Sequence, residues 1–284
     1  MDEKIATLYA DYRQGRLNRR DFVRKLAIVA GGTAAAAALI PRMEKNNSLF
    51  SEQDDQDLNT ESITYPGESG EIKAFMAWPK TGKKFPAVLI IHENRGLQPH
   101  IKDVTRRMAK EGFLSLAPDA LSPLGGTPEN DLDKAVKMIG QLDNDKTIKN
   151  LVAAVKYLKT NPLSTGKVGC TGFCWGGGMT NQVAVNSPDL DAAVPYYGKQ
   201  PTEEQVAKIK APIMAHYAGD DSFINPGIPA FEEALKKYKK EYQIFIYDGA
   251  KHAFNNDSNP ERYNEKAAKL AWSRTIAFFK EKLK

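Results

Sequence analysis

Apolar and polar positions follow two rhythms from residue 63 onward. Short apolar runs, typical of strands, alternate with longer segments whose apolar residues recur every three or four positions, as in helices. We predict strands at 71–78, 87–91, 113–117, 168–171, 192–197, 213–218 and 242–247, and helices at 101–110, 132–142, 148–158, 176–187, 231–238 and 265–283. This alternation predicts a mostly parallel central sheet with helices on both faces, an α/β fold.

The first 62 residues lack this alternation and are predicted to lie outside the globular domain, which we place at 63–284. In segment 1–43, Arg19 and Arg20 precede Phe22 and an uncharged run that Pro41 ends. This order is typical of a twin-arginine export signal. The alternative is a retained amphipathic N-terminal helix. Segment 44–62 is polar and is predicted to be a linker.

Export through the twin-arginine machinery would place the protein in the periplasm or outside the cell, whereas the alternative places it in the cytoplasm. The uncharged run, 26–40, is shorter than the roughly 20 residues that a membrane-spanning helix needs. Residues 34–38 offer several A-x-A cleavage positions, but no clear mature start follows them.

Composition and charge describe an ordinary globular protein. The chain has 284 residues, of which 42% are hydrophobic and 26% charged, with a net charge of +5. Residues 1–45 hold nine basic and five acidic residues, or +4, which leaves about +1 for the rest. A nearly neutral domain with a basic extension argues against nucleic-acid binding.

The two cysteines, Cys170 and Cys174, lie on one predicted strand and its following turn. An extended segment holds residues four apart beyond disulfide reach, about 7 Å between Cα atoms. Two cysteines cannot supply a cysteine-based zinc site either. At least one is therefore a candidate functional thiol.

A sharp strand-to-helix turn is predicted around Cys174. It reads Gly172-Phe173-Cys174-Trp175-Gly176, and glycine at both ends removes side chains that would collide. This is the nucleophile-elbow pattern of the α/β-hydrolase fold, with cysteine in place of serine. The helix N-terminus is expected to favour the thiolate. The alternative is that Cys174 is a small buried filler, as we expect of Cys170.

A cysteine nucleophile needs a base, and the base needs a group that orients it. In this fold the acid and then the histidine follow the nucleophile along the chain. Asp220 and Asp221 follow the 213–218 strand, and His252 follows the 242–247 strand. The other histidines lie at strand ends or at a helix start: His92, His216 and His100. The pattern therefore selects His252 but leaves the two aspartates unresolved.

The loop after the 87–91 strand is expected to complete an oxyanion hole. In this fold it supplies one backbone N–H, and the residue after the nucleophile supplies the other. The donors would be the amides of Asn94 and Trp175. Glu93 would stand at the mouth of the hole; the alternative for Glu93 is a surface ion pair with Arg95 or Lys102.

These residues resemble the dienelactone hydrolase (carboxymethylenebutenolidase) family. The resemblance rests on Glu93 to Gly96, Ala117-Pro118-Asp119, Gly172 to Gly177, Tyr196-Tyr197-Gly198, Gly219 to Phe223 and Gly249 to Phe254. It implies a triad of Cys174, Asp221 and His252. It also implies that Glu93 holds the resting thiol and helps to activate it, and that Tyr197 lies near the active-site pocket.

The sequence departs from the family pattern at two substrate-binding positions. Members specific for dienelactone carry an arginine four residues after the A-P-D aspartate and another four after the catalytic histidine, to pair with the substrate carboxylate. Here these positions are Pro123 and Asn256. Arg95 or Lys251 are candidate substitutes, and chlorinated dienelactone is not the expected natural substrate.

The sequence thus predicts a hydrolase of a small carboxylic ester or lactone that works through a thioester acyl-enzyme, with no metal or organic cofactor. We expect a monomer or a small homo-oligomer. The alternative is a non-catalytic binding protein or thiol redox sensor on the same fold.

Overall fold

The computed structural model describes residues 5, 8, 19–32, 57–128, 131–259 and 261–284. Residues 57–128, 131–255 and 262–284 form one compact unit, and the described residues among 1–56 and 256–261 belong to another. In the latter, helix α2 (Arg19–Ala30) begins at the paired arginines. The candidate cleavage positions at 34–38 and residues 44–56 of the predicted linker lie outside the described residues. No helix within the described ranges is long and apolar enough to cross a membrane.

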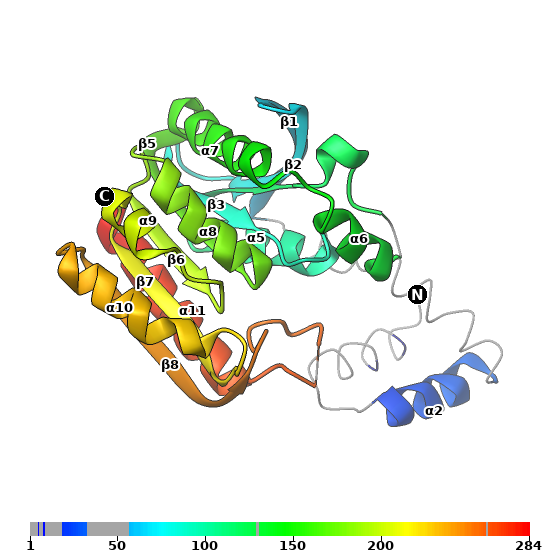
Figure 1. Cartoon of the computed structure of the whole chain (residues 1–284). Coiled ribbons are helices and arrows are strands. Elements are labelled where there is room, and N and C mark those ends of the chain that lie inside the picture. The colour runs from blue at the N-terminus through cyan, green and yellow to red at the C-terminus, as the bar shows by residue number, and fades with distance from the viewer. Residues whose placement is uncertain (1–4, 6–7, 9–18, 33–56, 129–130, 260) are drawn as a thin grey trace. The chain divides into compact units, whose positions relative to one another are not determined.

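The larger unit is built on an eight-stranded sheet with the order β1-β2-β4-β3-β5-β6-β7-β8 (Figure 1). The strands are β1 (Leu58–Gly67), β2 (Gly70–Pro79), β3 (Phe85–Ile91), β4 (Leu114–Pro118), β5 (Ser164–Phe173), β6 (Ala192–Tyr196), β7 (Ile213–Asp220) and β8 (Tyr242–Lys251). β2 pairs antiparallel with β1 and β4, whereas all other neighbours are parallel. The predicted mostly parallel α/β sheet is confirmed.

Helices cover both faces of the sheet. One core contains residues of α7 (Asn144–Thr160), α8 (Trp175–Asn186), α9 (Glu203–Lys208) and α10 (Ile228–Lys237). The other contains residues of α5 (Pro99–Lys110) and α11 (Glu265–Lys282). The short elements η1 (Ser122–Leu124), α6 (Leu132–Ile139) and η2 (Asn225–Gly227) lie in connections.

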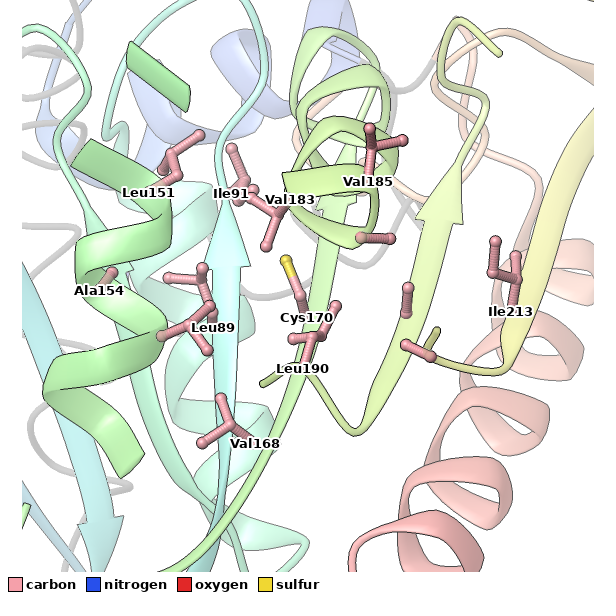
Figure 2. Packing of buried hydrophobic residues seen from close by; sticks show 14 of the residues in the cluster. Leu89, Ile91, Leu151, Ala154, Val168, Cys170, Val183, Val185, Leu190 and Ile213 are labelled. Carbon is pink, nitrogen blue, oxygen red and sulfur yellow. The ribbon is translucent and has the colours of Figure 1, made fainter. Parts of the chain in front are cut away.

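The central strand β3 shows why a continuous apolar run is needed. Leu89 and Ile91 join the core on the α7 side, while Val88 and Ile90 join the core on the α5 side. Successive side chains of a strand point to opposite faces, so a strand covered on both sides has no position for a polar residue. Figure 2 shows Leu89 and Ile91 packed with Val183 of α8 and Leu151 of α7.

Strand β1 and helix α9 were not predicted, and neither were the short 3-10 helices η1 and η2. Strand β1 begins at Leu58, so residues 58–62, expected in the linker, belong to the sheet, and the domain starts before residue 63. Half of the β1 residues are exposed at the sheet edge, so the strand has no hydrophobic run. Helix α9 has only six residues and begins with a capping box between Thr202 and Gln205.

Candidate active site

Cys174 lies at the sharp turn between β5 and α8, with φ 57° and ψ −117°. A positive φ is strained for a residue other than glycine, and surrounding contacts must hold it. The Cys174 amide donates to the Tyr196 carbonyl at 3.1 Å. A side chain on Gly172 would approach the Gly176 carbonyl oxygen to 2.3 Å, and one on Gly176 would approach the His92 carbonyl oxygen to 2.4 Å. The local geometry is therefore that of the predicted elbow.

The Cys174 thiol is largely buried and is protonated near neutral pH. Burial raises its pKa to about 11, and the nearby charge of Glu93 adds to the rise. The backbone N–H groups of Trp175 and Asn94 hydrogen-bond the sulfur and lower the pKa, but by less. The donors act in the direction expected of the helix N-terminus and favour the thiolate, but desolvation and a neighbouring carboxylate outweigh them.

His252 and Asp221 form a close pair. His252 Nδ1 lies 2.5 Å from Asp221 Oδ2, and the two side chains are 23% and 4% exposed. The other oxygen of Asp221 accepts from the amides of Ile224 at 3.1 Å and Phe223 at 3.3 Å. Asp220 is exposed at the end of β7. The pairing distinguishes the aspartates that the loop pattern left unresolved.

Tyr197 connects this pair with the thiol. Its buried ring lies 5.0 Å from the His252 ring, centroid to centroid. Burial raises the pKa of Tyr197, and the charges of Glu93 and Cys174 add to the rise. The charge of Asp221 also contributes to the raised pKa of Cys174. Charges act on one another in this way only at short range. Cys174, Glu93, Tyr197 and the His252–Asp221 pair therefore lie in one site at the carboxyl ends of the strands.

The loop after β3 contributes Glu93 and Asn94, both half-buried, and Arg95, which is exposed. The Arg95 carbonyl accepts from Gln98 Nε2 at 2.8 Å. Since the Asn94 and Trp175 amides both reach the Cys174 sulfur, the two predicted oxyanion donors converge on one point.

The described residues contain no group of three or more His, Cys, Asp or Glu side chains able to hold a metal ion. Cys170 and Cys174 are both free thiols, as predicted.

The two positions that depart from the family pattern hold uncharged side chains, which cannot pair with a substrate carboxylate as arginine does. Pro123 lies in η1. Asn256 Oδ1 accepts from the amide of Ser258 at 3.0 Å and from its hydroxyl at 2.5 Å.

Three residues beside the site were not predicted: His92, Asp119 and Thr127. His92 was set aside as a strand-end histidine, and Asp119 was noted only as part of the A-P-D motif. Thr127 gave no signal, because its partners are close in space and distant in sequence.

The chain is similar in sequence and fold to known proteins. The profile described as "Dienelactone hydrolase family" matches residues 72–283. A Saccharolobus solfataricus protein, provisionally named carboxymethylenebutenolidase, is 34% identical over 255 residues, with 77% of this chain and 97% of that protein covered. A Klebsiella pneumoniae structure, provisionally described as a dienelactone hydrolase, is 27% identical with a TM-score of 0.70, and the match covers 78% of this chain and 98% of that one.

A crystal structure of dienelactone hydrolase from Anabaena variabilis is 21% identical with a TM-score of 0.62, covers 81% of this chain and 100% of its own, and supports the fold alone. The profile match spans most of the chain, and the first relative exceeds 30% identity over nearly its full length. The chain therefore belongs to the dienelactone hydrolase family, and it is a carboxylic ester or lactone hydrolase with the α/β-hydrolase fold.

Proposed function

We propose that the chain hydrolyses a small ester or lactone through a triad of Cys174, His252 and Asp221. The observation that carries this proposal is the 2.5 Å contact between His252 and Asp221 beside an elbow cysteine that receives two backbone N–H groups. A buried carboxylate that accepts from one imidazole nitrogen orients the other nitrogen for proton transfer.

In the acylation step, Cys174 Sγ attacks the carbonyl carbon of the substrate, and its proton passes to His252. Because its pKa is raised, the thiol still carries this proton when the substrate binds. Glu93, whose charge acts on the thiol, is proposed to help in this transfer. Collapse of the tetrahedral intermediate expels the alcohol, which takes the proton from His252, and leaves a thioester.

The amides of Asn94 and Trp175 are proposed to stabilise the oxyanion of this intermediate. Loss of one such donor in a hydrolase typically costs about 3–4 kcal/mol of transition-state stabilisation. In deacylation His252 takes a proton from a water molecule, which attacks the thioester carbonyl; the C–S bond then breaks, the acid is released and Cys174 Sγ takes the proton back from His252.

Substrate recognition is proposed to involve Tyr197 and Arg95. Tyr197 is buried against His252, and Arg95 is exposed two residues after Glu93. Since Pro123 and Asn256 occupy the family's arginine positions, we do not expect a substrate held by two arginine–carboxylate pairs.

Activity of the Cys174→Ala and Cys174→Ser variants tests the proposal, with p-nitrophenyl acetate and a panel of lactones as substrates. We expect Cys174→Ala to lose at least about 10³-fold in kcat. Turnover by Cys174→Ala at the wild-type rate would exclude Cys174 as the nucleophile.

A redox sensor on this fold is disfavoured by the pKa of about 11. Oxidation proceeds through the thiolate, and a sensor cysteine therefore has a low pKa.

We propose that the N-terminal segment directs export by the twin-arginine route. The support is the sequence pattern around Arg19 and Arg20. Fractionation of expressing cells tests this proposal with Arg19→Lys/Arg20→Lys as the matched variant. Export of the wild type alone supports it, and equal cytoplasmic retention of both proteins contradicts it.

Size-exclusion chromatography with light scattering would decide between a monomer and a small homo-oligomer.

A further inference from the structure

His92 is a fully buried histidine that the triad does not use, and both of its ring nitrogens have backbone partners. The Ala120 amide donates to Nε2 at 3.1 Å, and Nδ1 lies 2.6 Å from the Glu93 carbonyl oxygen. A backbone N–H can only donate, so Nε2 accepts and Nδ1 carries the proton. The imidazole is therefore neutral and donates from Nδ1 to Glu93.

The Glu93 carbonyl and the Asn94 N–H belong to one planar peptide unit. His92 holds the oxygen of this unit, while the N–H on its opposite side acts on the Cys174 sulfur. Because the unit is rigid, fixing its oxygen also fixes the direction of its N–H.

The His92 ring also lies against Trp175, with the ring centroids 5.4 Å apart and the planes at 18°. The backbone N–H of Trp175 is the second donor to the sulfur. His92 thus contacts Trp175 and the peptide unit that carries the Asn94 N–H, and these two N–H groups are the donors to the nucleophile.

A second tether holds the far end of the loop. The Leu97 amide donates to Thr127 Oγ1 at 2.8 Å, and this hydroxyl donates to Asp119 Oδ1 at 2.7 Å. The Thr127 amide donates to Asp119 Oδ2 at 2.7 Å. A side chain on Gly96 would approach Thr127 Oγ1 to 2.2 Å, so glycine is required where the loop contacts the hydrogen-bonded Asp119–Thr127 pair.

We propose that His92 is the positioning residue of the oxyanion hole, and that the hydrogen-bonded Asp119–Thr127 pair holds the other end of the same loop. Both tethers end on segment 119–127, and the Asn94 amide lies between them. The role in hydrolysis rests on the proposed function, whereas the role in holding the loop does not.

Three substitutions of His92 separate its contacts. His92→Phe keeps a flat ring beside Trp175 and loses both hydrogen bonds. His92→Asn retains a donor near the Nδ1 position, and His92→Gln retains an acceptor near the Nε2 position. For p-nitrophenyl acetate we expect kcat of His92→Phe to fall by about 10- to 100-fold, below the limit for complete loss of one donor, with KM changed by less than about threefold. His92→Asn should recover more kcat than His92→Gln.

Thr127→Val tests the second tether in a milder way, because it keeps the side-chain shape and removes the hydroxyl. We expect kcat to fall by about 3- to 10-fold and Thr127→Ser to restore it. Thr147→Val is the matched control, since Thr147 makes a similar hydroxyl contact to the Asp143 carbonyl on α7. A kcat within about twofold of wild type in both His92→Phe and Thr127→Val would overturn the proposal, as would equal rescue by His92→Asn and His92→Gln.

Hydrogen exchange of the loop amides gives a readout that needs no hydrolysis. In His92→Phe and Thr127→Val, residues 93–97 should exchange faster than in wild type while α7 is unchanged. Unchanged exchange in this loop would reject the positioning role. Absence of esterase or lactonase turnover in wild type would instead reject the proposed function.

Discussion

Cys170 and Cys174 lie four residues apart on β5 and the turn that follows it, yet they contact different groups. Cys170 is fully buried within the strand, packed near Leu89 and Val183 (Figure 2), and its thiol lies 3.8 Å from the Thr180 hydroxyl. Cys174 lies past the strand end, where two backbone N–H groups and the charges of Glu93 and Asp221 act on it.

Both thiols have raised pKa values, about 12 for Cys170 and about 11 for Cys174. Acidity therefore does not separate the structural cysteine from the proposed nucleophile. Their placement does, because only the residue beyond the carboxyl end of the strand meets groups contributed by the neighbouring loops.

The largest effect is expected from breaking the His252–Asp221 pair, which lies in the site of Cys174 and has no counterpart around Cys170. Asp221→Asn should reduce kcat by about 10³- to 10⁴-fold, because the amide no longer orients and stabilises the imidazolium of His252. Asp220→Asn, exposed and one residue away, is the matched control and should stay within about twofold of wild type. Steady-state kinetics with p-nitrophenyl acetate measures both, and a reversed order would exclude Asp221 as the triad acid.

The second effect concerns the turn that carries Cys174 past the strand. A Cβ at residue 176 would lie 2.4 Å from the carbonyl oxygens of Ile91 and His92, both backbone atoms. We expect Gly176→Ala to lose about 3 kcal/mol of unfolding free energy and at least about tenfold in activity. Gly178→Ala meets nothing nearer than the Lys199 amide nitrogen at 3.5 Å, and it should be tolerated. Denaturant unfolding compares the two, and equal stability would show that the elbow does not need a glycine there.

A smaller effect sharpens the electrostatic difference between the two thiols. The charge of Glu93 raises the pKa of Cys174, so Glu93→Gln should lower that pKa and increase the thiolate fraction at any pH below it. At about pH 8 we expect iodoacetamide to alkylate Cys174 roughly 3- to 10-fold faster, while Cys170 stays unmodified. Peptide mass spectrometry reports both sites, and slower alkylation of Cys174 would contradict the assigned sign.

The smallest effect is expected at Cys170 and tests whether this residue only fills space in the core. Cys170→Ala should retain activity within about twofold and lose about 1–2 kcal/mol of unfolding free energy, since it leaves a sulfur-sized void in the core. Esterase kinetics and denaturant unfolding measure the two quantities. A loss of activity without a loss of stability would assign Cys170 a chemical role.

Much of this architecture was predictable because buried strands and glycine-flanked turns leave local patterns. The run AVLII predicted β3, and Gly172 with Gly176 predicted the elbow. The order of residues along the chain predicted His252, and the family resemblance selected Asp221, which the structure pairs at 2.5 Å.

The remaining features depend on contacts between distant segments. β1 is an exposed edge strand that its pairing with β2 stabilises, so no apolar run marks it. The protonated state of Cys174 follows from burial, which a sequence does not report. The bonds of His92 to Glu93 and Ala120 depend on where β3 and β4 end in space.

Trapping the acyl-enzyme is the most decisive test of Cys174 as the nucleophile. Wild-type protein is mixed with excess p-nitrophenyl acetate, quenched in acid and digested, and the peptides are analysed by mass spectrometry. We expect an acetyl group on Cys174 that hydroxylamine removes and that the Cys174→Ala variant lacks. Nitrophenol release at the wild-type rate with Cys174 unmodified, or with the acetyl group on another residue that turns over, would contradict this expectation.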